Sequence, residues 1–252
     1  MILCLQLVQY IQELLTCSNF NDYAPNGLQV EGKEAISSIA TAVTASESVI
    51  NEAINLQVDA LLVHHGFFWR GEKPTITGMK RVRIAKLLNH DINLLAYHLP
   101  LDCHLELGNN ACLGQLLDLQ DLKQHRIGNT PNLLWSGSFS LNKTSDEVLS
   151  LLTQQLKQKP IHIPGNDKSI KTIAWCSGAA QDLIEEAHAL KVDAYLSGEI
   201  SERTFYQAKE LGIHYFACGH HATERYGIQA LGQHLAEKFN LTHQFIDTEN
   251  FI

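Results

Sequence analysis

Residues 52–66, EAINLQVDALLVHHG, run from the end of a helical pattern into an apolar strand that finishes in two adjacent histidines. Neighbouring side chains of a strand point to opposite faces, so His64 and His65 would diverge if the strand continued through them. At the carboxyl end of a strand the chain leaves the pleat, and ligands of open α/β sheets bind outside these ends. The stretch therefore predicts an α/β fold with a polar site where this strand ends.

Helical and strand patterns alternate along the chain. We expect helices at residues 1–17, 46–57, 78–89 and 109–119, and strands at residues 37–46, 59–65 and 91–99. Residues 133–163 predict a strand, a capped helix and another strand. Such alternation is typical of an α/β layered fold with largely parallel pairing. The first segment lacks a basic start and has helical apolar spacing, which favours an amphipathic helix over a signal peptide.

The second half of the sequence repeats the first. Residues 186–200, EAHALKVDAYLSGEI, match residues 52–66 at an offset of 134, and two shorter matches follow in the same order. These pairs are INLLAYH with IHYFACG and LGQLL with LGQHL. Generic βα units can resemble one another, but the shared order favours an internally duplicated α/β protein, with its site between the halves. Turn residues place the join near residues 125–134.

Composition argues against several classes of protein. The 252 residues include 19 basic and 27 acidic side chains, and the formal charge of −8 disfavours a broad nucleic-acid-binding surface. No stretch is long and apolar enough to span a bilayer. The six cysteines form no CxxC pair and indicate reduced thiols of a cytoplasmic protein.

Potential metal ligands follow the ends of three predicted strands. They are His64 and His65, then His98, Asp102 and His104, then His220, His221 and Glu224. His220 and Glu224 are four residues apart and share one face of a helix that begins there. A carboxylate can bridge two cations, whereas an imidazole gives one nitrogen to one cation. A reasonable arrangement has His64, Asp102 and Glu224 on one ion, and His65, His220 and Glu224 on the other.

Each of these features alone has a simpler explanation. A pair of histidines is often incidental. An HxxxE pattern is common on helix surfaces, and Asp102 is also suited to capping a turn. His104 and His221 are interpreted as groups that support the ligands or face the substrate.

Motifs along essentially the whole chain resemble the GTP cyclohydrolase 1 type 2 family, also called the NGG-interacting-factor-three-like dinuclear metal proteins. They are DYAPNGLQVEG, VTAS, VDALLVHHGFFW, GMKRVR, NLLAYHLPLDCHLELGNN, AWCSGAAQ, DAYLSGE and CGHHATERYG. The resemblance implies two divalent ions at His64, His65, Asp102, His220 and Glu224, with Glu224 bridging them. It further implies two intertwined α/β repeats with mixed, largely parallel sheets, which we place at residues 1–128 and 129–252, and a homohexameric ring.

The resemblance also implies an activity, the opening of the guanine imidazole ring of GTP by a metal-bound hydroxide. His104 and His221 are then candidate proton carriers. The triphosphate would need cationic partners, and the candidates are Lys80, Arg81, Arg83, Arg203 and Arg225. Residues 78–83, GMKRVR, are better explained as a solvated helix face, and the chain has no Gly-rich loop ending in GK[ST].

Two other functions remain open from the sequence. One is a metal-binding scaffold or regulatory protein that acts through protein partners. The other is a dinuclear hydrolase of a different phosphoester or cyclic amide. Mixed imidazole and carboxylate ligation admits Zn, Fe, Mn, Ni or Co. We expect neither a membrane nor a nucleic-acid partner.

Overall fold

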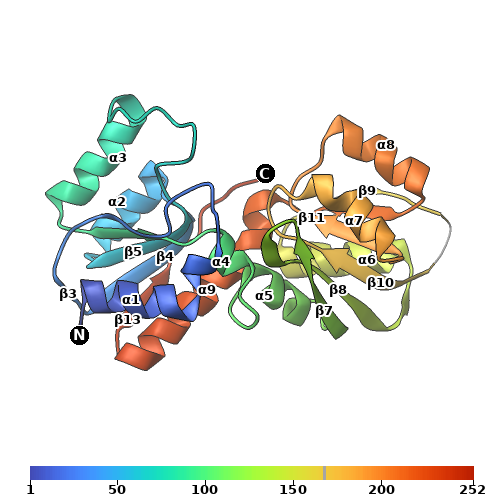
Figure 1. Ribbon diagram of the computed structural model, residues 1–252, viewed down its shortest axis with the longest axis horizontal. Helices are drawn as coiled ribbons and strands as arrows, with labels where there is room; N and C mark the ends of the chain where they lie inside the picture. The colour runs from blue at the N-terminus through green and yellow to red at the C-terminus, as the bar shows by residue number, and fades with distance from the viewer. Residues whose placement is uncertain (167–168) are drawn as a thin grey trace. The chain divides into compact units, whose positions relative to one another are not determined.

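The computed structural model describes residues 1–166 and 169–252 (Figure 1). These residues form two compact units. Unit 1 comprises residues 1–101 and 227–249, and unit 2 comprises residues 102–226 and 250–252. The chain passes between the units three times: within helix α4 (Leu99–Asp102), within helix α9 (His220–Phe239) and between Glu249 and Asn250.

The sheet of unit 1 has the strand order β13-β4-β5-β6-β2. Its strands are β2 (Gly27–Val30), β4 (Ser38–Thr44), β5 (Ala60–His65), β6 (Asn93–Ala96) and β13 (Thr242–Phe245), and β1 (Ile2–Leu3) pairs separately with β3 (Ala35–Ile36). The helices are α1 (Cys4–Leu14), η1 (Cys17–Asn19), α2 (Glu47–Asn55) and α3 (Gly78–Asn89). Pairing is parallel from β13 to β6, and β2 is antiparallel to β6.

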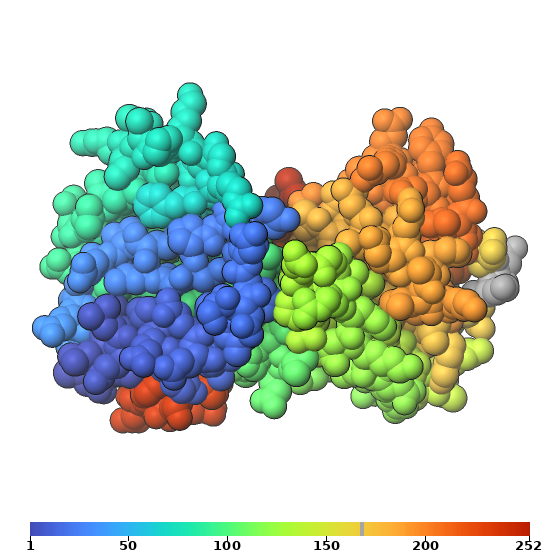
Figure 2. All heavy atoms as spheres, in the orientation of Figure 1, coloured from blue at the N-terminus to red at the C-terminus, as the bar shows by residue number. Residues whose placement is uncertain are grey.

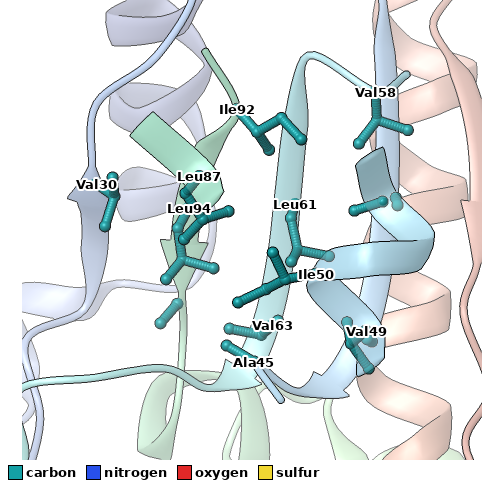
Figure 3. Packing of buried hydrophobic residues seen from close by; sticks show 14 of the residues in the cluster. Val30, Ala45, Val49, Ile50, Val58, Leu61, Val63, Leu87, Ile92 and Leu94 are labelled. Atoms are coloured by element: carbon teal, nitrogen blue, oxygen red, sulfur yellow. The ribbon is translucent and has the colours of Figure 1, made fainter. Parts of the chain in front are cut away.

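Helices cover both faces of this sheet. Leu61 and Val63 of β5 pack with α2 and α3, whereas Ala60 and Leu62 pack with α1 and the later part of α9. Figure 3 shows the first of these layers, with Ile50 of α2 against Leu61. Burying such an aliphatic side chain contributes about 1.5–3 kcal/mol, so packing on both faces of the sheet stabilises β5. α3 buries only its inner positions and lies at the surface of unit 1 (Figure 2).

The sheet of unit 2 has the order β7-β8-β10-β11-β12-β9. Its strands are β7 (Gln120–Ile127), β8 (Thr130–Lys143), β9 (Ile161–Ile163), β10 (Ile170–Trp175), β11 (Ala194–Ser197) and β12 (His214–Ala217). The helices are α5 (Asn109–Leu116), α6 (Ser145–Leu156), η2 (Gln181–Leu183), α7 (Ile184–Ala189) and α8 (Glu202–Leu211). β10, β11 and β12 are parallel, while the outer pairings are antiparallel. Helices α5 and α6 pack on one face, and α7 and α8 pack on the other.

The same hydrogen-bonded arrangement of an aspartate occurs once in each of the two sheets. Oδ2 of Asp59 accepts the backbone N–H groups of residues 37 and 38 at 2.9 and 3.0 Å. Oδ2 of Asp193, which lies 134 residues later, accepts those of residues 171 and 172 at 2.9 and 2.8 Å. Each carboxylate therefore joins the starts of two neighbouring parallel strands, and the register of these strands also corresponds at this offset.

Most expectations about local structure are confirmed. The helix expected at residues 78–89 is α3, the first helix is amphipathic, and the Ser46 side chain caps α2 by accepting from the Val49 N–H. A mixed α/β fold is present, although antiparallel pairing is more common in unit 2 than the sequence suggested. Residues 125–134 lie in the β7–β8 hairpin of unit 2. Because compact units and sequence repeats divide a chain by different criteria, the repeat boundary at residues 128 and 129 stays a prediction.

All six cysteines are free thiols, as their spacing in the sequence indicated. Among the described residues, no helix combines the length and the apolar character needed to cross a membrane.

Candidate metal centre

His64 is positioned by the alternation of β5. It follows Ala60 and Leu62 on the face that packs against α1, and only 1% of its surface is exposed. Its Nδ1 donates to the backbone carbonyl of Tyr97 over 2.9 Å, because a carbonyl oxygen can only accept. This bond selects the tautomer whose Nε2 carries the lone pair, which is the arrangement typical of metal-binding histidines.

His65 and His98 complete a group of imidazoles in unit 1. Nδ1 of His65 lies 3.3 Å from the hydroxyl of Thr44, and Nδ1 of His98 lies 2.7 Å from a carboxylate oxygen of Asp22. Each of the three histidines offers a ligand atom, and these atoms all lie within 4.8 Å of one another. The divergence expected of neighbours on a strand is therefore small where β5 ends.

Asp102 lies at the end of α4 and is 5% exposed. Its Oδ1 accepts from the Asn109 amide over 2.9 Å and from the Ser177 hydroxyl over 3.0 Å. These two donors fix the carboxylate from two different segments of unit 2. The sequence suggested a capping role as the simpler alternative, but both of these donors are side chains and not the backbone of the next turn.

His220 and Glu224 share one face of a helix, as the sequence predicted. α9 begins at His220, and Nε2 of that ring lies 3.2 Å from Oε2 of Glu224, which is 2% exposed. A carboxylate oxygen of Glu224 also lies within 4.8 Å of one of Asp102. Unit 2 thus holds an imidazole and two carboxylates in one group.

Glu199 is a functional candidate that the sequence reasoning missed. It follows the end of β11, and its Oε1 accepts from Nδ1 of His220 over 2.6 Å. The ring is therefore oriented by a carboxylate on its far side, which favours ligation through Nε2. A signal was present, because Glu199 stands 134 residues after His65 in the aligned repeat.

The surroundings of His220 shift its pKa. Burial lowers the pKa of the ring, but hydrogen bonds and charge from Glu224 and Glu199 outweigh burial and raise it to about 9. The neighbouring thiol of Cys176 is fully buried, and burial together with the charges of Asp102 and Glu224 raises its pKa well above the ordinary value. Burial and the two nearby carboxylates thus favour the neutral form of the Cys176 thiol.

The absence of a side chain at Gly178 leaves room for the carboxylate of Glu224. The φ of Gly178 is +66°, which a residue with a side chain rarely adopts, and a Cβ there would lie 2.2 Å from Oε1 of Glu224. The same Cβ would lie 3.2 Å from Nε2 of His220. The segment CSGAAQ is thus a strand-to-helix turn, as expected, and it also makes room for the carboxylate.

The two predicted proton carriers lie in unit 2. Nδ1 of His104 accepts the N–H groups of Glu106 and Leu107 at 3.2 and 3.0 Å, so it organises its own loop and its proton resides on Nε2. His221 is 7% exposed, and its backbone N–H donates to the carbonyl of Ile252. Their roles as proton carriers stay predictions.

Several of the predicted phosphate-binding cations already have partners. Lys80 pairs with Glu72 at 3.3 Å and lies over the ring of Phe68. Arg203 pairs with Asp182 at the surface. Residues 78, 79, 81 and 82 of GMKRVR are exposed, which supports the interpretation of this segment as a solvated helix face.

The structure defines an α/β protein with imidazole and carboxylate groups at the ends of parallel strands, suited to holding divalent metal ions. The chain belongs to the Duf34/NIF3 (NGG1p interacting factor 3) family, whose model matches residues 3–250.

Relatives and solved structures agree with this assignment. The chain is 48% identical over 244 residues to a GTP cyclohydrolase 1 type 2 homolog of Allochromatium vinosum, covering 97% of this chain and 95% of that protein. It is 49% identical over 248 residues to a protein of the same name from Vibrio cholerae, covering 98% of each. A solved structure described as protein ybgI, of unknown function, is 44% identical, covers both chains completely and superposes with a TM-score of 0.95.

Proposed function

We propose that the two groups of side chains form one dinuclear metal centre. One divalent ion is bound by His64, Asp102 and Glu224, and the other by His65, His220 and Glu224. Glu224 would be the bridge because it belongs to both groups and its carboxylate has two oxygens to offer. The mixed donors suit Zn, Fe, Mn, Ni or Co.

One observation carries this proposal. Nδ1 of His64 donates to a backbone carbonyl, and Nδ1 of His220 donates to the carboxylate of Glu199. Nδ1 of both rings is thereby occupied, which leaves Nε2 as the nitrogen for a metal ion, as is usual for metal-binding histidines. The donor set of this chain therefore fits divalent ions.

The bound ions would supply Lewis acidity and lower the pKa of coordinated water. The protein orients the ligands: Asn109 and Ser177 fix Asp102, Glu199 fixes His220, and Gly178 leaves room for Glu224. His104 and His221 are the candidates for moving a proton at an imidazole nitrogen.

We further propose that the chain is a GTP cyclohydrolase that opens the guanine imidazole ring. The names of the relatives from Allochromatium vinosum and Vibrio cholerae support this substrate. Two ligand carboxylates against two divalent cations leave a net positive centre, which favours an anionic substrate such as a nucleoside triphosphate. The family resemblance additionally supports a homohexameric ring, which light scattering of the purified chain would test.

The hydrogen bonds that Asp59 and Asp193 each accept from a neighbouring strand support the inference that the chain is internally duplicated. Asp59 and Asp193 make equivalent backbone hydrogen bonds at the offset of 134 that the sequence repeats share. The duplication would place the strand ends that bear His65 and Glu199 in equivalent positions.

The activity is tested by incubating metal-loaded protein with GTP and following loss of the nucleotide by chromatography. We expect slow, metal-dependent conversion, which chelators, Asp102→Ala and His65→Ala abolish. His90→Ala changes an exposed histidine at the end of α3 and serves as the matched control, with an unchanged rate. A metal-loaded wild type that leaves GTP intact would overturn the substrate, and variants that keep the wild-type rate would show that the activity is a contaminant.

A further inference from the structure

A third imidazole lies beside His64 and His65 in unit 1. The ring centroid of His98 is 5.0 Å from that of His64 and 5.7 Å from that of His65. The indole ring of Trp69 packs edge-on against His98 at 5.0 Å. His98 is thus enclosed by the two proposed ligands and an aromatic wall, although the five-residue metal centre assigns it no role.

A buried carboxylate orients this ring. The Asp22 side chain is 3% exposed, and it accepts from Nδ1 of His98 over 2.7 Å. Its oxygens also accept from the Asn26 amide at 2.8 Å and from the backbone N–H groups of Tyr23 and Leu99 at 2.6 and 2.9 Å. The carboxylate is therefore a preorganised anionic acceptor.

The Asp22–His98 pair also has a structural use. The backbone N–H of His98 donates to Oδ1 of Asn26, so the pair ties residues 22–26 to the end of β6. An anchor of this kind needs only the Nδ1 side of the ring. It does not account for a ligand nitrogen of His98 lying within 4.8 Å of those of His64 and His65.

We propose that His98 is an additional nitrogen ligand of the metal centre, on the ion that His64 binds, with Asp22 as its positioning residue. This inference rests on the proposed function, which it extends by one ligand. A carboxylate on Nδ1 sets the tautomer and increases the basicity of Nε2, as in carboxylate–histidine–metal arrangements.

The geometry requires only a small adjustment. Zn–N bonds are about 2.0–2.1 Å long, so two nitrogens at tetrahedral positions lie about 3.4 Å apart. Starting from nitrogens within 4.8 Å, the two rings would have to approach by at most about 1.4 Å on binding an ion. His64 is the partner of choice because its ring lies nearer to His98 than the ring of His65 does.

Cobalt(II) binding tests the inference independently of catalysis. The metal-free protein is titrated with Co²⁺ in competition with a chromophoric chelator, and the visible absorption reports the ligands. We expect His98→Ala to lower the affinity for the tighter ion about 10- to 100-fold and to change the spectrum, and Asp22→Asn to weaken affinity in the same direction. Added imidazole should restore the spectrum of His98→Ala.

Two controls separate ligation from anchoring. Asn26→Ala removes the bond to the His98 backbone and one donor to Asp22 but keeps the imidazole, so its affinity should fall clearly less than that of His98→Ala. His98→Gln keeps a side chain of similar size and should bind metal as weakly as His98→Ala, which guards against a variant that fails to fold.

The failure of this inference is distinguishable from failure of the metal centre. If His98→Ala and His98→Gln bind Co²⁺ with wild-type affinity and spectrum while His64→Ala loses the ion, His98 is only an anchor and the five-residue centre stands. Equal losses in Asn26→Ala and His98→Ala, without rescue by imidazole, would also overturn the inference. Wild-type binding by His64→Ala would overturn both proposals.

Discussion

The substitution Gly178→Ala would displace Glu224, the proposed bridging ligand, while leaving the Glu224 side chain itself unchanged. The added Cβ would lie 2.2 Å from Oε1 of Glu224, whereas ordinary van der Waals contact begins at 3.4 Å. The carboxylate oxygen must therefore move by about 1.2 Å if the backbone stays in place. Metal–ligand distances tolerate only about ±0.2 Å, so the displaced carboxylate cannot keep its place on both ions.

The backbone contributes a second, separable cost. Gly178 has a φ of +66°, and an L-residue in the left-handed region loses about 1–2 kcal/mol. Gly128, in the β7–β8 turn, has a φ of +54°, and a Cβ added there would meet nothing within 4 Å, so Gly128→Ala carries the strain without the clash. Urea unfolding should show a loss of about 1–2 kcal/mol for Gly128→Ala and at least as much for Gly178→Ala.

Metal binding then separates the two variants. Chelator competition should show that Gly178→Ala binds divalent ions at least about 10-fold more weakly than the wild type, as expected when a supporting contact is lost. Gly128→Ala should bind them with wild-type affinity. If Gly178→Ala binds metal as tightly as Gly128→Ala, Glu224 is not held where the proposal needs it and the reasoning is refuted.

Three further predictions concern single side chains. Glu224→Ala should lose more metal than His104→Ala by elemental analysis, because only Glu224 is proposed to contact both ions, and equal losses would contradict that ranking. Glu199→Gln should lower metal affinity about 10- to 100-fold in the same competition assay, because the acceptor of His220 Nδ1 loses its charge; an unchanged affinity would remove Glu199 from the centre. Asp59→Asn should lower the free energy of unfolding by about 2–3 kcal/mol at pH 7. Burial raises the pKa of Asp59, but hydrogen bonds from Lys33, Ser37 and Ser38 outweigh burial and bring the pKa below its ordinary value. The contribution of Asp59 is therefore present above the unfolded pKa of about 3.9 and is lost as the pH falls through the folded value. The difference between wild type and variant should accordingly shrink below about pH 4, and a constant difference would refute this assignment.

The sequence predicted the elements whose signals are local. The periodicity of residues 78–89 and the cap at Ser46 depend on neighbours within one or two turns, and both match the structure. The spacing of His220 and Glu224 is likewise a property of one helix, provided that the helix begins at His220, as it does. Gly128 lies in a turn, although the sequence alone did not identify the hairpin around it.

The supporting residues could not be predicted because their partners are distant in sequence. Asp22 and His98 are 76 residues apart, and Glu199 and His220 are 21 apart. No sequence pattern identifies the partner of a loop carboxylate such as Asp22, and the one signal for Glu199 is its alignment with His65 at the repeat offset of 134. Only the fold brings the carboxylates of Asp22 and Glu199 to Nδ1 of an imidazole. The five ligands proposed from the sequence lie in recognisable motifs, whereas the groups that orient the imidazoles do not.

The central claim is most directly tested by measuring metal per chain. Elemental analysis gives the bound metal, and the protein concentration is measured in the same sample. Both measurements are made on the protein as isolated and after reconstitution with a divalent metal. The proposed centre predicts two divalent ions per chain, reduced in His64→Ala and in Glu224→Ala but unchanged in His90→Ala. One ion or none in the reconstituted wild type would contradict it.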